Sequence, residues 1–135
     1  MSQFAVDKKE MEKRRGLIIC ARRMIAEMFQ PESMDEDTMM TEYHDFFVQI
    51  SFSEIHPLIV INFVRKIPKI NLGMLSLINE LNLTSVLGCH AINDTADCYS
   101  YRATLWLDTE FSSGRFEEIL LRCVEEAHRG CCAVM

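Results

Sequence analysis

The cysteine and histidine side chains are the ones best able to do chemistry in this chain, as metal ligands or, for cysteine, as a nucleophile. Zinc sites usually bring their ligands in close pairs, such as two cysteines or two histidines a few residues apart. The candidate ligands are His44, His56, Cys89, His90, Cys98 and His128. Cys89 and His90 are neighbours on an expected strand, so their side chains point to opposite faces. The spacing predicts no metal site and no cofactor.

Cysteine catalysis needs a thiolate, which requires a nearby base or a helix N-terminus together with some exposure. Cys20 and Cys123 fall in or beside the apolar stripes of expected helices, and we interpret them as small buried hydrophobes. Cys98 adjoins a polar loop and could be exposed, but nothing near it in sequence would activate it. The paired carboxylates at 117–118 and 125–126 indicate a solvated acidic helix side. We expect no catalytic residue and no enzymatic activity, and a cysteine-dependent enzyme or redox switch is the weakest alternative.

The last four residues, Cys132-Ala133-Val134-Met135, fit the pattern for prenylation of a cysteine. Cys131 could accept a second lipid. The pattern is short, however, no polybasic segment precedes it, and one lipid gives only marginal binding to a bilayer. We interpret the match as a coincidence and expect no membrane partner.

Aromatic side chains are concentrated on the expected strands, and this feature points most directly to a function. The set is Phe46, Phe47, Phe52, Phe63, Tyr99, Tyr101 and Trp106. Protein interfaces favour such side chains because they bury large areas at little entropic cost. A sheet that helices cover on one face only must expose or pair the other face. We therefore predict a partner-binding surface with Trp106, Phe47, Tyr99 and Tyr101, and Trp106, on the strand side opposite Tyr99 and Tyr101, is the best candidate.

The elements that position these residues begin with a helix over Asp7–Phe29, where apolar residues recur at three- and four-residue steps. Gln30-Pro31 should end this helix, because proline disfavours helical geometry at the preceding residue. The acidic segment from Glu32 to Glu42 is expected to be a connection, with room for a short strand at Thr38–Tyr43. The first helix is thus expected to lead into a sheet.

Two clear strand patterns follow. Residues Phe46–Ser53 have the period-two pattern of a strand with one more apolar face. Leu58–Val64 is nearly uniformly apolar and rich in β-branched residues, as in a central strand. A helix is expected over Lys69–Leu83. Ser85–Ile92 and Cys98–Leu107 then flank a polar loop and predict an antiparallel hairpin.

The last expected element is a helix that starts at Ser112 or Ser113 and stops at Arg129–Gly130, which leaves residues 130–135 as a tail that need not be ordered. The order α-β-β-(β)-α-β-β-α predicts an α+β fold, an antiparallel sheet with helices packed on it as a two-layer sandwich. With 135 residues and 49% hydrophobic content, the chain should form a single domain over 1–135.

Four stretches form a familiar pattern. They are Leu77-Ile78-Asn79-Glu80-Leu81-Asn82 at a helix end, Gly88 in a strand, Asn93-Asp94, and Tyr99-Ser100-Tyr101-Arg102-Ala103. The pattern, over about residues 46 to 129, resembles the YbjN-like family of bacterial proteins, whose fold is similar to that of type III secretion chaperones. The resemblance implies an α+β sandwich that often pairs into dimers, no enzymatic activity, and a chaperone-like or regulatory role. The acidic connection and the cysteine-rich tail depart from the family pattern.

Charge and hydropathy restrict the partners and the location. A net charge of -6 opposes binding to a phosphate backbone, so no nucleic-acid partner is expected. Half of the Lys and Arg residues lie in the first 23, where most face away from the apolar stripe and indicate a solvated helix side. The N-terminus is too charged for a signal peptide, and the apolar run Leu58–Val64 is too short to span a bilayer. We expect a cytoplasmic protein with reduced thiols.

The first functional hypothesis is a non-enzymatic interaction module, chaperone-like or regulatory and dimeric, that buries an open sheet face or edge against a protein partner. The alternative is a small-molecule sensor whose ligand lies between the sheet and the first helix, lined by Met24, Met28 and Phe29. The two hypotheses differ in whether that region holds a cavity.

Overall fold

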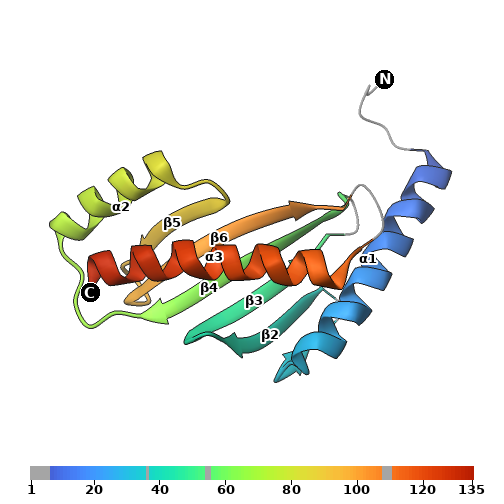
Figure 1. Ribbon diagram of the computed structural model, residues 1–135, viewed down its shortest axis with the longest axis horizontal. Helices are drawn as coiled ribbons and strands as arrows, with labels where there is room; N and C mark the ends of the chain where they lie inside the picture. Colours follow the sequence, from blue (N-terminus) through green and yellow to red (C-terminus); the bar gives the residue numbers. More distant parts are fainter. Residues whose placement is uncertain (1–6, 36, 54–55, 108–110) are drawn as a thin grey trace.

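The computed structural model describes residues 7–35, 37–53, 56–107 and 111–135. Its elements are α1 (Lys8–Phe29), β1 (Ser33–Met34), β2 (Thr38–Tyr43), β3 (Phe46–Phe52), β4 (Leu58–Lys66), α2 (Leu72–Thr84), β5 (Gly88–Asn93), β6 (Cys98–Trp106) and α3 (Ser113–Val134). Within these ranges, six strands form one antiparallel sheet in the order β1-β2-β3-β4-β6-β5. α3 crosses one face of the sheet, with α1 near one end of α3 and α2 near the other (Figure 1). The predicted α+β sandwich is confirmed.

α1 begins and ends where the sequence predicts. The side chain of Asp7 accepts a hydrogen bond from the backbone N–H of Glu10 and caps the first turn. At the other end, Gln30 adopts a left-handed conformation with φ of 48°, and the chain leaves the helix before Pro31. The buried residues of α1 are Ile18, Ala21 and Ile25. Their three- and four-residue spacing places one side of the helix against the core.

The acidic segment from Glu32 to Glu42 contributes to two strands, of which the sequence predicts only β2. β2 pairs with β3 along its whole length, and Met39 and Thr41 point into the core. The tight turn His44-Asp45 joins the two strands with φ values of 48° and 70°, a conformation that Asp and His tolerate better than most residues. β1 is missing from the prediction because a strand this short produces no periodic pattern.

β3 and β4 form the centre of the sheet. Alternate residues of β3 from Phe46 to Phe52 are buried, as predicted. β4 lies between β3 and β6, which confirms it as a central strand. Its residues on the helix side, Ile59, Ile61 and Phe63, are fully buried. Val60 and Val64, on the other side, are only partly buried. The apolar run therefore belongs to a strand that the described helices cover on one side.

α3 starts at the predicted position, where the side chain of Ser112 caps the helix by accepting a hydrogen bond from the N–H of Arg115. The predicted stop at Arg129–Gly130 is wrong, because α3 continues to Val134. Residues 130–134 are helical rather than a loose tail, and Cys131 and Val134 among them are buried against the core. The apolar packing of Cys131 and Val134 stabilises the helix beyond Gly130.

Gly130 marks a close approach between elements. It is buried, and a Cβ at this position would overlap the ring of His90 and the hydroxyl of Tyr99. Only the absence of a side chain lets α3 pass this close to β5 and β6. Gly130 therefore does not stop the helix. It is needed because a larger residue would not fit between α3 and the sheet.

Candidate functional site

The open face of the sheet, meaning the side away from α3, carries two of the four aromatic residues that the sequence assigns to a partner. Trp106 is 60% exposed and Phe47 is 41% exposed. Trp106 lies opposite Leu58 at one end of β4, and Phe47 lies opposite Val64 near the other end. At the rise of an extended strand, this register separates the two aromatic side chains by about 20 Å. A partner that contacts both must therefore extend along the strands.

Tyr99 and Tyr101 lie on the other side of β6, and the structure corrects their assignment as contact residues. Both are fully buried between the sheet and the helices. The ring of Tyr101 packs against Phe63 and His90, with centroid separations of 5.8 Å and 5.2 Å. The two tyrosines are core residues because the strand alternation that exposes Trp106 turns them inward. Their hydroxyls consequently need buried partners.

The partner of Tyr101 is Glu126 of α3, which accepts a hydrogen bond from the tyrosine hydroxyl. The same carboxylate accepts from the backbone N–H groups of Val86 at 2.8 Å and Leu87 at 3.2 Å. Glu126 is only 9% exposed, so the prediction of a solvated acidic side holds for Glu125 and not for Glu126. Burial by itself would raise the pKa of Glu126, but these hydrogen bonds outweigh burial and lower it. We call Glu126, Tyr101, Val86 and Leu87 the Glu126 cluster. Its hydrogen bonds connect α3 to the segment between α2 and β5.

Asn82 fixes the end of α2 to the edge strand β5. Its side-chain amide donates to the carbonyl of His90 at 2.9 Å and accepts from the N–H of the same residue at 2.7 Å. The amide thus takes the place of a neighbouring strand and blocks this part of the sheet edge. The His90 ring turns inward and shares a hydrogen bond of 2.5 Å with the hydroxyl of Tyr99. Burial lowers the pKa of His90, so its ring is neutral at pH 7.

α2 and the connection after it expose a group of large apolar side chains that we call the α2 surface. Its members are Leu72, Leu75, Leu77, Leu83, Val86 and Leu87. The most exposed are Leu72, Leu83 and Val86, each above 80%. Within the sequence of α2, Glu80 is the one charged residue. Exposed apolar groups of this kind mark interaction sites more often than scattered surface residues do.

The α2 helix has apolar residues on two opposite sides. Met74, Ile78 and Leu81 pack inward against the core. Leu72, Leu75 and Leu83 form a second stripe that points to solvent, at the three- and four-residue steps of one helix side, with Asn79 between Leu75 and Leu83. A surface helix normally has a single apolar side, which it buries against its own core. The spacing rule that predicts a helix over Lys69–Leu83 could also have found the outer stripe.

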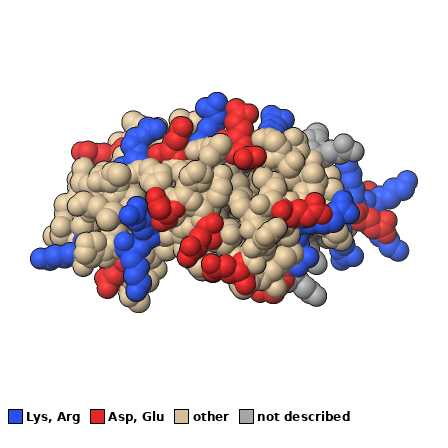
Figure 2. Space-filling model, turned by 60° about the horizontal axis from the view of Figure 1, so that its bottom comes forward, with Lys and Arg blue, Asp and Glu red and all other residues tan. Residues whose placement is uncertain are grey.

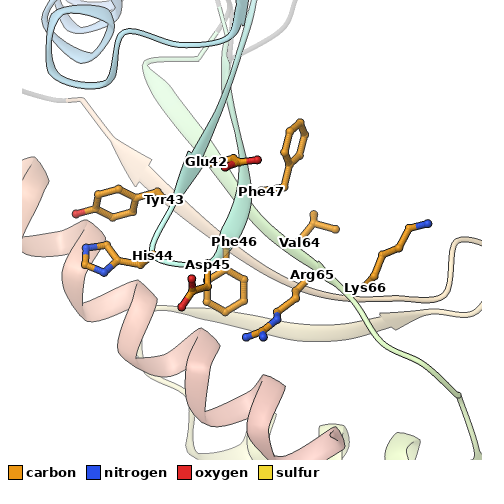
Figure 3. A pocket seen from close by; sticks show the side chains of 9 residues that line it. All are labelled: Glu42, Tyr43, His44, Asp45, Phe46, Phe47, Val64, Arg65 and Lys66. Carbon is orange, nitrogen blue, oxygen red and sulfur yellow. The ribbon is translucent and has the colours of Figure 1, made fainter.

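Two cavities lie near the β2–β3 turn. The larger, about 470 Å³, is lined by Glu42, Tyr43, His44, Asp45, Phe46, Phe47, Val64, Arg65 and Lys66. Figure 3 shows Tyr43 and His44 pointing from the turn toward α3, while Lys66 points away from it. The smaller, about 350 Å³, is lined by Met28, Phe29, Tyr43 and Glu117. Met28 and Phe29 are two of the three residues that the sensor hypothesis names, and Met24 does not line this cavity.

The buried cysteines Cys123 and Cys131 are not positioned as activated nucleophiles. Burial raises the pKa of Cys123 to about 11 and also raises that of Cys131, so both thiols stay protonated at neutral pH. Cys98, which the sequence suggested could be exposed, is buried. Among the residues that the structure describes, no group of three or more His, Cys, Asp and Glu side chains is placed to hold a metal ion. Over the same residues, no helix is both long and apolar enough to cross a membrane.

The basic residues near the N-terminus lie on the exposed side of α1. Figure 2 shows Lys and Arg side chains at the end of the molecule that α1 forms, with Asp and Glu side chains among them. Lys8, Lys9, Lys13, Arg15 and Arg23 are exposed, whereas Arg14 pairs with Glu10 at 3.3 Å. The mixture of signs fits the predicted solvated helix side.

The chain has an α+β fold similar to that of a proposed bacterial regulator and of a chain from a chaperone–effector complex, although no family model and no curated protein matches its sequence. One similar solved structure is YbjN, a proposed transcription regulator from E. coli, at 9% identity and a TM-score of 0.60, over 81% of this chain and 84% of that one. Another is a chain of the HopA1–SchA chaperone–effector complex, at 12% identity and a TM-score of 0.56, over 92% of this chain and 96% of that one. The predicted YbjN-like, chaperone-like fold is confirmed.

Proposed function

We propose that this protein is a non-catalytic interaction module that pairs with a second copy through the α2 surface and offers the open face of its sheet to a protein partner. The observation that carries the proposal is the outward stripe of Leu72, Leu75 and Leu83 on a helix that already packs against its own core. A second copy presents the same stripe, so two α2 helices related by a twofold axis would bury each other. Asn79, between two leucines, could fix the register of that pair.

The fold neighbours support a role in protein binding. One of them comes from a chaperone–effector complex and the other is a proposed transcription regulator. The open face suits a polypeptide partner because Trp106 and Phe47 lie far apart on it. The partly buried β4 side chains Val60 and Val64 lie on the same face, and Val64 is paired with Phe47. The Asn82 amide blocks β5 at His90, so we assign the partner to the face rather than to that edge. Cytoplasmic location, bacterial origin and the lack of a nucleic-acid partner stay predictions.

Replacing Leu83 with glutamate should weaken self-association tenfold or more, because a charged side chain buried in an apolar helix pair must be desolvated. The measurement is sedimentation velocity over a concentration series. Ile19→Glu is a matched control, since Ile19 is a similarly exposed apolar residue on α1, outside the α2 surface. Equal dimer fractions for the wild-type protein and Leu83→Glu would remove α2 from the interface.

Trp106→Ala should leave the fold intact and reduce partner capture by tenfold or more, as expected for a large aromatic contact residue. Stability should change by less than about 0.5 kcal/mol, because the side chain is mostly exposed. Capture is measured by quantifying the polypeptides that copurify with each variant. Thr104→Ala, an exposed change on the same face of β6, serves as control. Undiminished capture by Trp106→Ala would show that Trp106 does not contact the partner.

A further inference from the structure

The smaller cavity combines aromatic rings with a carboxylate. It lies where the end of α1, the end of β2 and the first turns of α3 meet, and its volume of about 350 Å³ falls within the range of small-molecule sites. The rings of Phe29 and Tyr43 stand nearly perpendicular, with centroids 5.2 Å apart and an interplanar angle of 82°. His44 also makes an edge contact with the Tyr43 ring, at a centroid distance of 4.4 Å and an interplanar angle of 84°. Of these rings, those of Phe29 and Tyr43 line the smaller cavity, whereas His44 lines the larger one.

Within the described part of the chain, Glu117 is the one charged residue that lines this cavity. It has no ion pair or hydrogen bond among the residues that the structure describes. Its neighbour Glu118 is different, because it pairs with Arg122 one turn further along α3 at 3.3 Å. Burial, followed by the negative charge of Glu117, raises the pKa of Tyr43, so the tyrosine stays neutral and adds no competing charge. A cation would therefore complement the site.

The lining also selects the kind of cation. A primary ammonium or a metal ion is strongly hydrated and needs several oxygen ligands, whereas the described lining offers one carboxylate, a tyrosine hydroxyl, a thioether and ring faces. An alkylated ammonium group spreads its charge over methyl groups and loses little hydration. Such groups bind against the negatively charged faces of aromatic rings.

We infer that the cavity of Met28, Phe29, Tyr43 and Glu117 is a binding site for an alkylated ammonium group, held by the two rings and balanced by the Glu117 carboxylate. The group could belong to a free small molecule or to a methylated lysine of a polypeptide. The site is separate from the α2 surface and from Trp106, so this inference does not depend on the proposed function.

The test is a titration of the isotope-labelled protein followed by NMR. Choline is compared with 3,3-dimethyl-1-butanol, a neutral molecule of the same shape, and with terminally blocked Nε-trimethyllysine. We expect the cations to shift the signals of Phe29, Tyr43 and Glu117 and to bind about tenfold more tightly than the neutral isostere. Tighter binding of choline than of the lysine derivative indicates a free ligand, and tighter binding of the lysine derivative indicates a polypeptide source.

Two variants complete the test. Glu117→Gln keeps the shape of an exposed side chain and should weaken choline binding about threefold to tenfold. Glu118→Gln, with the same change of charge one residue away, should leave it unaltered. Equal binding of choline and its neutral isostere would overturn the inference. So would the absence of shifts at the lining residues with tens of millimolar of either cation.

Discussion

Replacing Glu126 with alanine is expected to lower the free energy of unfolding by about 3 kcal/mol. The substitution leaves the hydroxyl of Tyr101 and the backbone N–H groups of Val86 and Leu87 without their acceptor in a buried site. Chemical denaturation at one fixed protein concentration measures the change. Glu125→Ala removes the exposed neighbouring carboxylate and should change stability by less than about 0.5 kcal/mol.

The same cluster gives the protein a pH dependence. The pKa of Glu126 is lower in the folded protein than the ordinary value of 4.5, so the folded state binds fewer protons. Its stabilising contribution is therefore complete above pH 4.5 and is lost as the pH falls through the folded-state value. The wild-type protein should lose more stability than Glu126→Gln over this acidic range. Parallel pH profiles of the two proteins would contradict the role given to the carboxylate.

Gly130→Ala is expected to destabilise the protein by about 2 kcal/mol, although alanine is the better helix former. The added Cβ would overlap the His90 ring and the Tyr99 hydroxyl, so α3 must move away from the sheet. Gly16→Ala provides the opposite control in α1, where a Cβ would meet nothing within 4 Å.

The control substitution should stabilise the protein by about 0.5–1 kcal/mol, the usual gain from replacing a glycine inside a helix. Thermal unfolding of the two variants beside the wild-type protein measures both effects. A stability gain from both substitutions would show that α3 does not approach β5 and β6 as closely as the structure has it.

The sequence predicts much of the fold because periodicity reports burial directly. The alternation from Phe46 to Phe52 and the stripe of α1 depend on local spacing, and both agree with the structure. The end of α3 depends on a contact with His90, forty residues earlier in the chain, which makes Gly130 a packing residue. A stop signal and a close approach use the same amino acid, so local rules cannot distinguish them.

The candidate site was predictable in part. Strand alternation correctly places Trp106 on the side opposite Tyr99 and Tyr101, but it does not say which side the helices cover. The sequence predicts Glu126 as one of a solvated pair, yet it lies three residues after Cys123 and four before Gly130, on the buried stripe of α3. A carboxylate on an apolar stripe is a signal that sequence analysis can use.

The cation site could not be foreseen from local sequence. Phe29, Tyr43 and Glu117 come from α1, β2 and α3, and only the packing of these elements brings them together. The sensor hypothesis names Met28 and Phe29, together with Met24, as residues that line a ligand site between the sheet and the first helix. The carboxylate that defines the ligand class lies some ninety residues away.

Native mass spectrometry of the protein purified gently from its own cell tests the central claim most directly, because one spectrum reports copy number and any bound polypeptide. The chain has a mass of 15.7 kDa. We predict a species of twice this mass, alone or with a further polypeptide bound. A single chain at every concentration, with no polypeptide bound, would contradict the interaction module and leave the α2 surface without a function.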